Sequence, residues 1–306
     1  MRNQRRVLRL AIVVFALVLL AGRAYLGRPP LDSGPSAPGT GGTARPDAPG
    51  GALRVHFIDV GQGDAILVQL PNGRAMLVDA GEAANAPTVV RYLRAHGVKT
   101  IDYLVATHPH ADHIGGMAAI LDSFEVRDVY MPRSSHTTNV YEDLLTAIKA
   151  KGLLVTEARA GREVPAGPGV EIVFAAPRGG DYRDANDWSA VLRISCGHTS
   201  FLLAGDAGSK SEGEMLVSGR VSLRADVLKV AHHGSGTSTT PEFLAAVAPR
   251  YAVISVGSDN PFGHPSPRTV ERLLAVGAEV FRTDLHGTIV IESDGSNLGV
   301  KKEREG

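Results

Sequence analysis

The amino-acid sequence predicts an α/β or α+β fold for most of the chain. Short apolar runs rich in Val, Ile and Leu are bounded by Gly, Pro, Asn and Asp, which is the pattern of buried strands. Segments with the apolar spacing of helices stand between several of these runs, in both halves of the chain. Hydrophobic residues make up 43% of the 306 residues, which is enough to build a sizeable core.

The first 51 residues stand apart from this pattern. Arginines at positions 2, 5, 6 and 9 precede an apolar run at 10–21, which is shorter than the roughly 20 residues of a membrane-spanning helix. We therefore expect residues 1–27 to be a signal peptide or, if uncleaved, a single N-terminal membrane anchor. The protein would then lie outside the cytoplasm, either secreted or held at the cytoplasmic membrane. Residues 28–51 are rich in Pro and Gly and are expected to form a flexible linker.

The charge is unevenly distributed along the chain. Residues 1–51 carry seven Arg and two Asp, so the other residues hold 25 basic and 30 acidic side chains, a net charge of −5. A net-acidic domain is not typical of a protein that coats duplex DNA, although bound cations would offset its charge locally. The single cysteine, Cys196, excludes an internal disulfide and lies in an apolar run, where we expect it to be buried.

The globular domain is expected to span residues 52–295, followed by a charged tail at 296–306. Strands are predicted at 53–60, 64–70, 75–78, 101–106, 126–131, 170–175, 191–196, 199–203, 226–231, 251–256, 279–283 and 288–292. Helices are predicted at 85–96, 113–124, 139–151, 240–247 and 268–276.

Four metal-ligand side chains follow the strand at 101–106 within six residues: His108, His110, Asp112 and His113. Packing such groups in a core is costly, whereas a loop at a strand end can gather them around a cation. Imidazole and carboxylate suit zinc, manganese or iron. The two-residue spacing of the first two histidines turns them the same way, and the last two residues can serve a second ion. A solvated loop with chance histidines is the less favoured interpretation.

Two later strand ends supply further ligand candidates. Asp206 follows the apolar strand 199–203, which fits a carboxylate that bridges two metals. His232 and His233 follow the strand 226–231, and only one of them would face the metal if the strand continued. We place His232 among the ligands and His233 among the catalytic residues, with the reverse assignment left open.

Three more residues are candidates for contact with substrate. His264 lies in a Gly-His-Pro loop after the strand 251–256, where it suits phosphate binding or proton delivery to a leaving group; a surface histidine is the alternative. Ser235, after the paired histidines, is a second substrate-binding candidate. His136, in the Ser/Thr-rich loop 134–138, would reach substrate only if that loop overhangs the site.

The motif His-x-His-x-Asp-His at 108–113, followed by Ile-Gly-Gly, resembles the signature of the metallo-β-lactamase superfamily. The surrounding sequence resembles one branch, the hydrolase domain of ComEC-type competence proteins, over roughly residues 52–295. The resemblance does not extend to the membrane-spanning helices of a competence channel. The segments that carry it lie at 59–65, 77–81, 204–207, 229–235 and 260–265.

This resemblance implies a four-layer αββα sandwich with two divalent metal ions, zinc or manganese, at one edge. It implies a phosphodiesterase or nuclease that acts on DNA outside the cytoplasmic membrane, with DNA uptake as a candidate role. Asp112, His233 and His264 would be its catalytic residues. The alternatives are an extracytoplasmic hydrolase of another ester, such as a cell-wall phosphodiester, and a non-catalytic accessory binding module. The expected partner is DNA or another phosphodiester. The cytoplasmic membrane is a second partner if the N-terminus is uncleaved, and no oligomeric state is predicted.

The sequence departs from most of the superfamily at the third metal-binding histidine. It has Asn186-Asp187-Trp188-Ser189 instead, similar to the Asn-Asp-x-Ser of the competence branch, so Asn186 or Asp187 is a candidate ligand. Oxygen ligands would favour manganese. Asp59 and Asp79 each end a strand, where a carboxylate either orients a metal-binding imidazole or caps the next turn. Both options stay open for Asp59, and the resemblance favours the site for Asp79.

Overall fold

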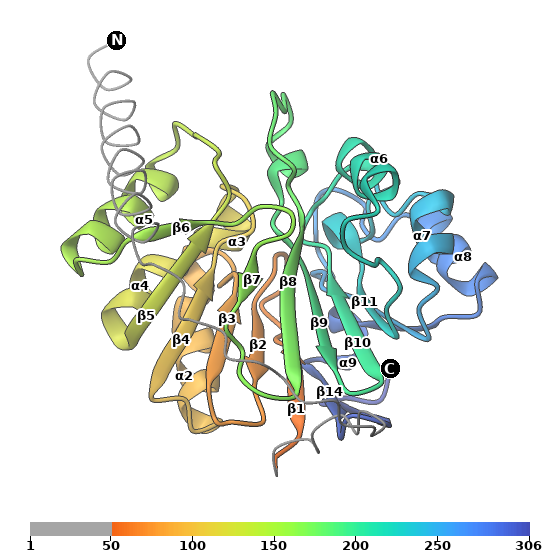
Figure 1. The fold of residues 1–306 in the computed structure, drawn as a ribbon, viewed down its shortest axis with the longest axis horizontal. Coiled ribbons are helices and arrows are strands. Elements are labelled where there is room, and N and C mark those ends of the chain that lie inside the picture. The colour runs from red at the N-terminus through yellow and green to blue at the C-terminus, as the bar shows by residue number, and fades with distance from the viewer. Residues whose placement is uncertain (1–50) are drawn as a thin grey trace, which may run out of the picture.

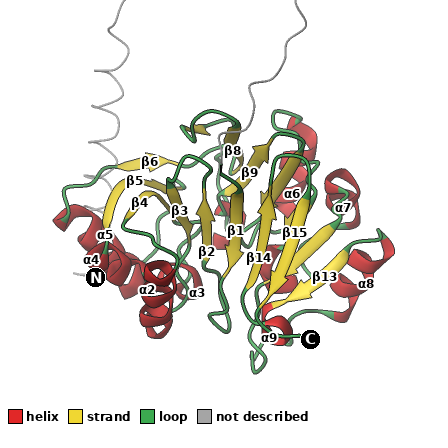
Figure 2. Ribbon diagram, turned by 90° about the horizontal axis from the view of Figure 1, so that it is seen from below, coloured by secondary structure: helices red, strands yellow, loops and turns green. Residues whose placement is uncertain are grey.

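Two β-sheets face each other at the centre of the molecule, and helices cover the outer face of each sheet (Figure 1, Figure 2). The computed structural model describes residues 51–306. This arrangement confirms the predicted mixture of helices and strands and the four-layer αββα order.

The first sheet has eight strands in the order β15-β14-β1-β2-β3-β4-β5-β6. Its first strands pair antiparallel, whereas β3 to β6 run parallel, because helices cross over between them. Its strands are β1 (Leu53–Phe57), β2 (Ile66–Gln69), β3 (Ala75–Val78), β4 (Thr100–Val105), β5 (Glu125–Met131), β6 (Val155–Glu157), β14 (Ile289–Ser293) and β15 (Leu298–Lys302).

The second sheet has seven strands in the order β13-β12-β11-β10-β9-β8-β7. Strands β10 to β13 are parallel, and β7 to β10 pair antiparallel. Its strands are β7 (Glu163–Val164), β8 (Val170–Ala176), β9 (Val191–Cys196), β10 (Thr199–Leu203), β11 (Val227–Lys229), β12 (Tyr251–Ile254) and β13 (Glu279–Arg282).

Helices flank the two sheets on their outer sides (Figure 1). Those associated with the first sheet are η1 (Ala83–Asn85), α2 (Ala86–Ala95), α3 (Ala111–Ile114), α4 (Met117–Ser123) and α5 (Asn139–Ala150). Those in the second half of the chain are η2 (Ala185–Trp188), α6 (Ser209–Ser218), η3 (Ala231–Gly234), α7 (Pro241–Val247), α8 (Pro267–Ala275) and α9 (Thr283–His286).

Three hydrophobic clusters hold the four layers together. One fills the space between the sheets, with Phe57 and Phe174 from opposite sides. A second joins the first sheet to α2, α4 and α5, and a third joins the second sheet to α6, α7 and α8. Cys196 lies in the cluster between the sheets, buried as predicted. Burial of apolar surface on both faces of each sheet is what stabilises this arrangement.

The structure corrects three expectations about the elements. Residues 296–306 are not only a charged tail, because β15 pairs with β14 and extends the sheet beyond residue 295. The helix predicted at 113–124 is broken at Gly115 and Gly116, where a side chain would overlap the backbone of residues 82–83 and of Ala80 respectively. The short strands β6 and β7 and the helix α6 were not predicted, since their sequences lack a clear apolar period.

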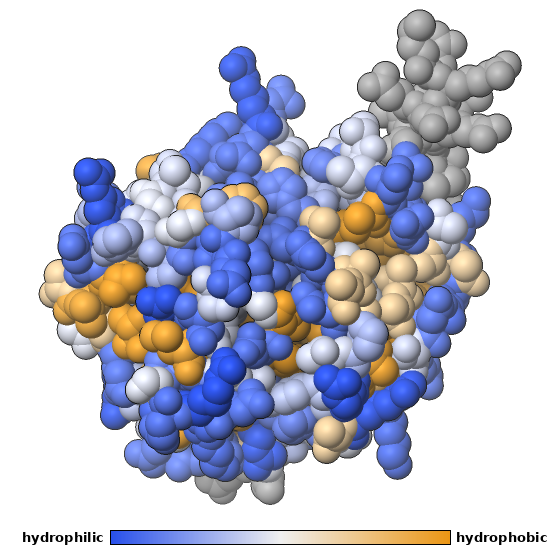
Figure 3. Space-filling view, turned by 180° about the vertical axis from the view of Figure 1, so that it is seen from behind, coloured by the Kyte–Doolittle hydropathy of each residue, from blue (hydrophilic) through white to orange (hydrophobic). Residues whose placement is uncertain are grey.

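The expected signal peptide or anchor at 1–27 and the expected linker at 28–51, apart from residue 51, lie outside the described residues. Within residues 51–306, no helix combines the length and hydrophobicity needed to cross a bilayer. The rear face is mainly hydrophilic, with hydrophobic side chains gathered in separate patches (Figure 3).

Candidate metal centre

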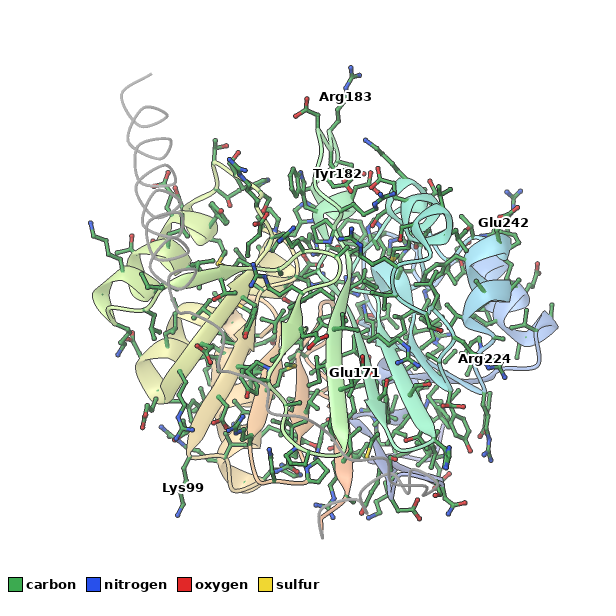
Figure 4. All side chains as sticks on the ribbon, viewed as in Figure 1. Lys99, Glu171, Tyr182, Arg183, Arg224 and Glu242 are labelled. Atoms are coloured by element: carbon green, nitrogen blue, oxygen red, sulfur yellow. The ribbon has the colours of Figure 1, made fainter. Side chains whose placement is uncertain are left out.

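The candidate ligands gather at one edge of the sandwich, where β3, β4, β10 and β11 end. Lys99, which precedes β4, lies at the opposite edge (Figure 4). Arg183, in the loop after β8, projects beyond the edge where β4 and β8 end. The carboxyl ends of these parallel strands therefore bring together side chains that are more than a hundred residues apart in sequence.

Asp79 fixes the loop that carries the histidines. Its carboxylate accepts hydrogen bonds from the Thr107 amide at 2.8 Å and the Thr107 hydroxyl at 2.6 Å, and lies 2.8 Å from His113 Nδ1. Its backbone has a φ of 57°, a strained conformation for a residue other than glycine. Burial raises the pKa of Asp79, while the neighbouring His113 opposes that shift. Because Nδ1 of His113 donates to this carboxylate, Nε2 is left for a metal.

Three sets of ligand atoms share His113, and the atoms within each set lie within 4.8 Å of one another. The first set also contains His108 and Asp206, and the second also contains Asp112 and His233. The third contains Asp64 and Asp79, on the side of Nδ1, which Asp79 already engages. His110 adjoins the first set, with its Nδ1 3.1 Å from His108 Nε2. All four residues predicted in the loop and the predicted Asp206 therefore meet at one place.

Electron-pair acceptors converge in this cluster. His233 Nδ1 lies 2.8 Å from the Ser255 carbonyl oxygen, which can only accept, so Nε2 carries the lone pair of the neutral ring. That Nε2 faces His113 Nε2 at 3.3 Å, Asp112 Oδ2 at 3.3 Å and Asp206 Oδ2 at 3.5 Å. The buried Asp206 Oδ1 accepts no hydrogen bond within the described residues. Acceptors held this close need a cation between them, so the residues fit divalent metal ions.

Charges in the cluster are strongly coupled. Burial by itself would lower the pKa of His113, but the carboxylates of Asp206 and Asp79 raise it well above its usual value. Burial by itself would raise the pKa of Asp206, but His113 and His233 lower it well below the usual range. Burial lowers the pKa of His108, with His113 adding to the effect. In metal-free protein the Asp206 carboxylate therefore stays ionised, and a proton on the neighbouring His113 ring balances its charge.

The comparisons with known proteins agree with this geometry. The family model of the metallo-beta-lactamase superfamily matches residues 58–258. The chain belongs to the metallo-beta-lactamase superfamily. It is 31% identical over 252 residues to ComE operon protein 3 of Bacillus subtilis, covering 77% of this chain and 32% of that protein. It is 33% identical over 247 residues to competence protein ComA of Neisseria gonorrhoeae, covering 80% and 33% respectively. The chain thus spans about a third of the length of these relatives.

A solved structure supports the fold assignment. CmlA, a diiron beta-hydroxylase from Streptomyces venezuelae, matches with a TM-score of 0.54 at 18% identity, covering 80% of this chain and 55% of that chain. At this identity the likeness concerns the fold. The family model and the competence relatives identify the protein as a member of this metallo-hydrolase superfamily that is homologous to competence proteins. Its histidine and aspartate clusters are candidate metal-binding residues.

The structure favours His233 over His232 as the superfamily ligand after β11. The strand ends at Lys229, and both histidines adopt left-handed backbone conformations in the turn η3, so strand alternation does not apply. His233 is buried and joins a ligand set, whereas His232 is partly exposed and its Nε2 lies 3.9 Å from Asp206 Oδ2. The assignment of His232 as ligand and His233 as catalytic residue is thus better reversed.

The segment at 186–189, which stands in place of the third metal-binding histidine, contributes side chains with different contacts. Asp187 Oδ1 accepts from the Ser211 amide at 3.2 Å, in the first turn of α6, so this carboxylate is engaged in positioning that helix. Asn186 Oδ1 is buried and has no hydrogen-bond partner within the described residues. Ser189 Oγ accepts from the Asp206 amide at 3.1 Å and thereby positions the bridging candidate. Asn186 is the better candidate of the two for a metal.

Asp59 lies outside the metal centre. Its Oδ1 accepts from the Gly61 amide at 3.1 Å, and its Oδ2 accepts from Arg304 at 3.0 Å. It therefore caps a turn and ties down the chain after β15. Of the two interpretations left open by the sequence, the structure shows the capping role.

Sequence reasoning missed a buried ion pair next to the metal centre. Lys229 Nζ lies 2.5 Å from Asp64 Oδ2, and neither side chain is more than 1% exposed. Asp64 also lies 3.8 Å from His113 Nδ1 and 3.7 Å from His233 Nδ1, behind the two rings. The sequence holds a partial signal, because a lysine within one apolar run and an aspartate at the start of another each need a partner if they are buried.

Three further histidines line the approach to the centre. His264 faces His232, with ring centroids 5.5 Å apart, and His136 faces His110 at 6.0 Å. Burial lowers the pKa of His232 and of His264, so both rings are mainly neutral near pH 7. Ser235 is buried, with its hydroxyl 2.9 Å from Thr237 Oγ1, so its side chain supports the turn after η3.

Proposed function

We propose that the protein is a divalent-metal-dependent phosphodiesterase that cleaves DNA outside the cytoplasmic membrane. The observation that carries this proposal is the convergence of acceptor atoms from His113, His233, Asp112 and Asp206 within 3.3–3.5 Å. Such a set suits two cations rather than one, because the ligand groups of His108 and of His233 both include His113. The Asp206 carboxylate of the first group also lies 3.5 Å from His233 Nε2 of the second.

The ligands would divide between two positions. His108 and His110 would hold one cation, Asp112 and His233 the other, with Asp206 placed to contact both. Divalent ions in these positions would supply Lewis-acid activation of water and stabilise the charge that develops on phosphoryl oxygens. Asp79 would keep His113 oriented throughout, since its carboxylate holds Nδ1 at 2.8 Å.

The histidines at the rim would handle the departing group. His264 and His232 stand side by side next to Asp206, which places a ring within reach of a leaving oxygen. Burial lowers the pKa of both rings, so a ring would have to take up a proton before delivering it to the departing oxygen. Their neutral forms still offer a ring N–H to a phosphate oxygen.

DNA as the substrate is supported by the competence relatives, whose matched regions make up about a third of their length. The acidic balance of the domain, 30 acidic against 25 basic side chains outside residues 1–51, is nearly offset by two divalent cations. An extracytoplasmic location and a role in DNA uptake are parts of this proposal that stand on the N-terminal sequence and on these relatives.

The test uses the full chain, stripped of metal and reloaded with manganese or zinc. Single-stranded DNA and bis(p-nitrophenyl) phosphate are assayed together, beside Asp206→Ala and an Asp59→Ala control, whose side chain bonds Gly61 and Arg304 rather than a candidate ligand. Cleavage of both substrates by wild type and the Asp59 variant, abolished in the Asp206 variant, is the expected result.

Other outcomes would redirect the assignment. Cleavage of the small ester alone would retain the chemistry and exclude DNA as the substrate. Two bound metals without cleavage of either compound would overturn the phosphodiesterase and leave a hydrolase of another ester. Neither metal nor cleavage would leave a binding module.

A further inference from the structure

Phe262 is an aromatic side chain left in solvent beside the metal centre. It is 64% exposed, and among the exposed large hydrophobic residues of 51–306 it is the aromatic one. A single exposed apolar side chain needs no explanation by itself. The position of Phe262 and the rigidity of its loop are what set it apart.

A short series of rings joins Phe262 to the ligands. Its ring stacks on His264, with centroids 5.8 Å apart and planes inclined by 26°. His264 in turn lies 5.5 Å from His232, whose Nε2 is 3.9 Å from Asp206 Oδ2. Two ring contacts therefore link Phe262 to His232, which itself adjoins a carboxylate of the proposed metal centre.

The loop that presents Phe262 is held in one conformation by Asn260. The side-chain amide of Asn260 donates to the carbonyl oxygens of Gly257 at 2.8 Å and His264 at 2.7 Å. Its oxygen accepts from the amides of Phe262 at 3.2 Å and His264 at 2.9 Å. All the hydrogen-bonding groups of this side chain are thus engaged in shaping the loop.

The same loop is tied to the turn that carries His233. The Ser266 amide donates to the Gly234 carbonyl at 2.8 Å, and Gly234 lies so close to Pro265 that a side chain there would overlap it. The position of Phe262 relative to the ligands is therefore fixed before any substrate arrives, and binding would order few groups.

We propose that Phe262 is a stacking platform for a nucleobase adjoining the phosphodiester at the metal centre. This inference rests on the proposed function and specifies its substrate as single-stranded nucleic acid. Bases in a duplex stack on each other and have no free face, whereas an unpaired base can stack on an exposed ring. Stacking also tolerates any base, so the platform would confer strand-type selectivity without sequence selectivity.

The experiment compares Kd values for a short fluorescent oligothymidylate and for a strand of equal length with abasic sites. Binding of the full chain is followed by anisotropy in Ca²⁺, and the strands are checked for integrity afterwards. The variants are Phe262→Ala, Phe262→Trp and the control Leu274→Ala, which removes an exposed side chain from α8.

We expect Phe262→Ala to weaken binding of the base-bearing strand by between about fivefold and about a hundredfold, the loss of one stack. The abasic strand should bind wild type and Phe262→Ala with equal Kd values. Duplex DNA should also bind these two proteins with equal Kd values. Phe262→Trp should retain binding, and Leu274→Ala should match wild type. Equal effects of Phe262→Ala on both single strands, or no effect on either, would overturn the platform.

The result separates this inference from the proposed function. If wild type prefers the base-bearing strand through Phe262 but cleaves no phosphodiester in manganese or zinc, the platform stands and the phosphodiesterase fails. If DNA is cleaved while Phe262→Ala binds both strands as wild type does, the phosphodiesterase stands and the platform fails.

Discussion

Lys229 Nζ and Asp64 Oδ2 lie 2.5 Å apart in a place where neither side chain meets solvent. Lys229 belongs to β11 and also donates to the Gly205 carbonyl at 3.3 Å, while Asp64 precedes β2, so the pair joins the two sheets. Asp64 lies behind His113 and His233. The pair therefore supports the metal centre from beneath and adds no net charge to it.

Replacing Lys229 with methionine should strongly destabilise the fold. It leaves the Asp64 carboxylate buried without a partner, and breaking a buried pair costs about 3–5 kcal/mol of unfolding free energy. Urea denaturation measures the change. The exposed pair of Arg54 and Glu292 provides the matched control, and Arg54→Met should cost less than about 1 kcal/mol.

The double variant Asp64→Asn with Lys229→Met should recover much of that loss, because no buried charge then remains. If Lys229→Met unfolds at the same urea concentration as Arg54→Met, the buried pair has no special role in stability.

Metal content should distinguish the two adjacent histidines. His233→Ala removes an Nε2 that faces Asp112 and Asp206, so we expect affinity for one of two manganese ions to fall by more than about a hundredfold. His232→Ala should retain both ions, because His232 belongs to none of the ligand sets. Equilibrium dialysis followed by elemental analysis gives the ions bound per chain. Loss of an ion from the His232 variant alone would restore the assignment drawn from the sequence.

Local sequence patterns were sufficient for the loop at 107–113 and for Asp206. Each of these ligands follows an apolar strand directly, so the strand end fixes its place in the fold. The two histidines after β11 were harder, because the strand stops at Lys229 and left-handed backbone at His232 and His233 reverses the expected directions. Strained backbone of this kind depends on tertiary contacts and has no local signature.

Long-range pairing explains the remaining differences. β15 became a strand through its pairing with β14, although its own sequence is charged and contains a glycine. Asp59 and Asp79 both come shortly after a strand, yet one meets Arg304 and the other meets His113. Partners this distant in sequence are decided by the topology, which a single sequence shows only through resemblance.

Asp79→Asn and Asp59→Asn form a matched pair of variants. The amide at position 79 would weaken the hold on His113 Nδ1, and loss of such an orienting carboxylate typically lowers metal affinity about 10- to 100-fold. Asp59→Asn touches only a turn and Arg304, so its manganese affinity should equal that of wild type. Calorimetric titration with Mn²⁺ measures both. Equal losses in the two variants would mean a general loosening of the fold rather than a role for Asp79 at the site.

Acid should destabilise the fold through His56, a residue of β1 whose ring contacts Tyr92, Gln69 and His96 and none of the candidate ligands. Burial, with His96 adding to it, lowers the pKa of His56 from 6.5 to about 4. The unfolded chain therefore binds a proton more readily than the native protein. The stability that the neutral ring contributes is fully present above pH 6.5, the pKa of the ring in the unfolded chain. It is lost as the pH falls from there towards about 4, the pKa in the native protein.

Between about pH 7 and about pH 5 this linkage should cost wild type about 2 kcal/mol of unfolding free energy. His56→Gln has no titrating ring, so the difference in stability between wild type and the variant should shrink by that amount over the same interval. Urea midpoints at several pH values measure the difference, and other titrating groups cancel because both proteins contain them. A difference that stays constant with pH would show that His56 keeps an ordinary pKa in the native protein.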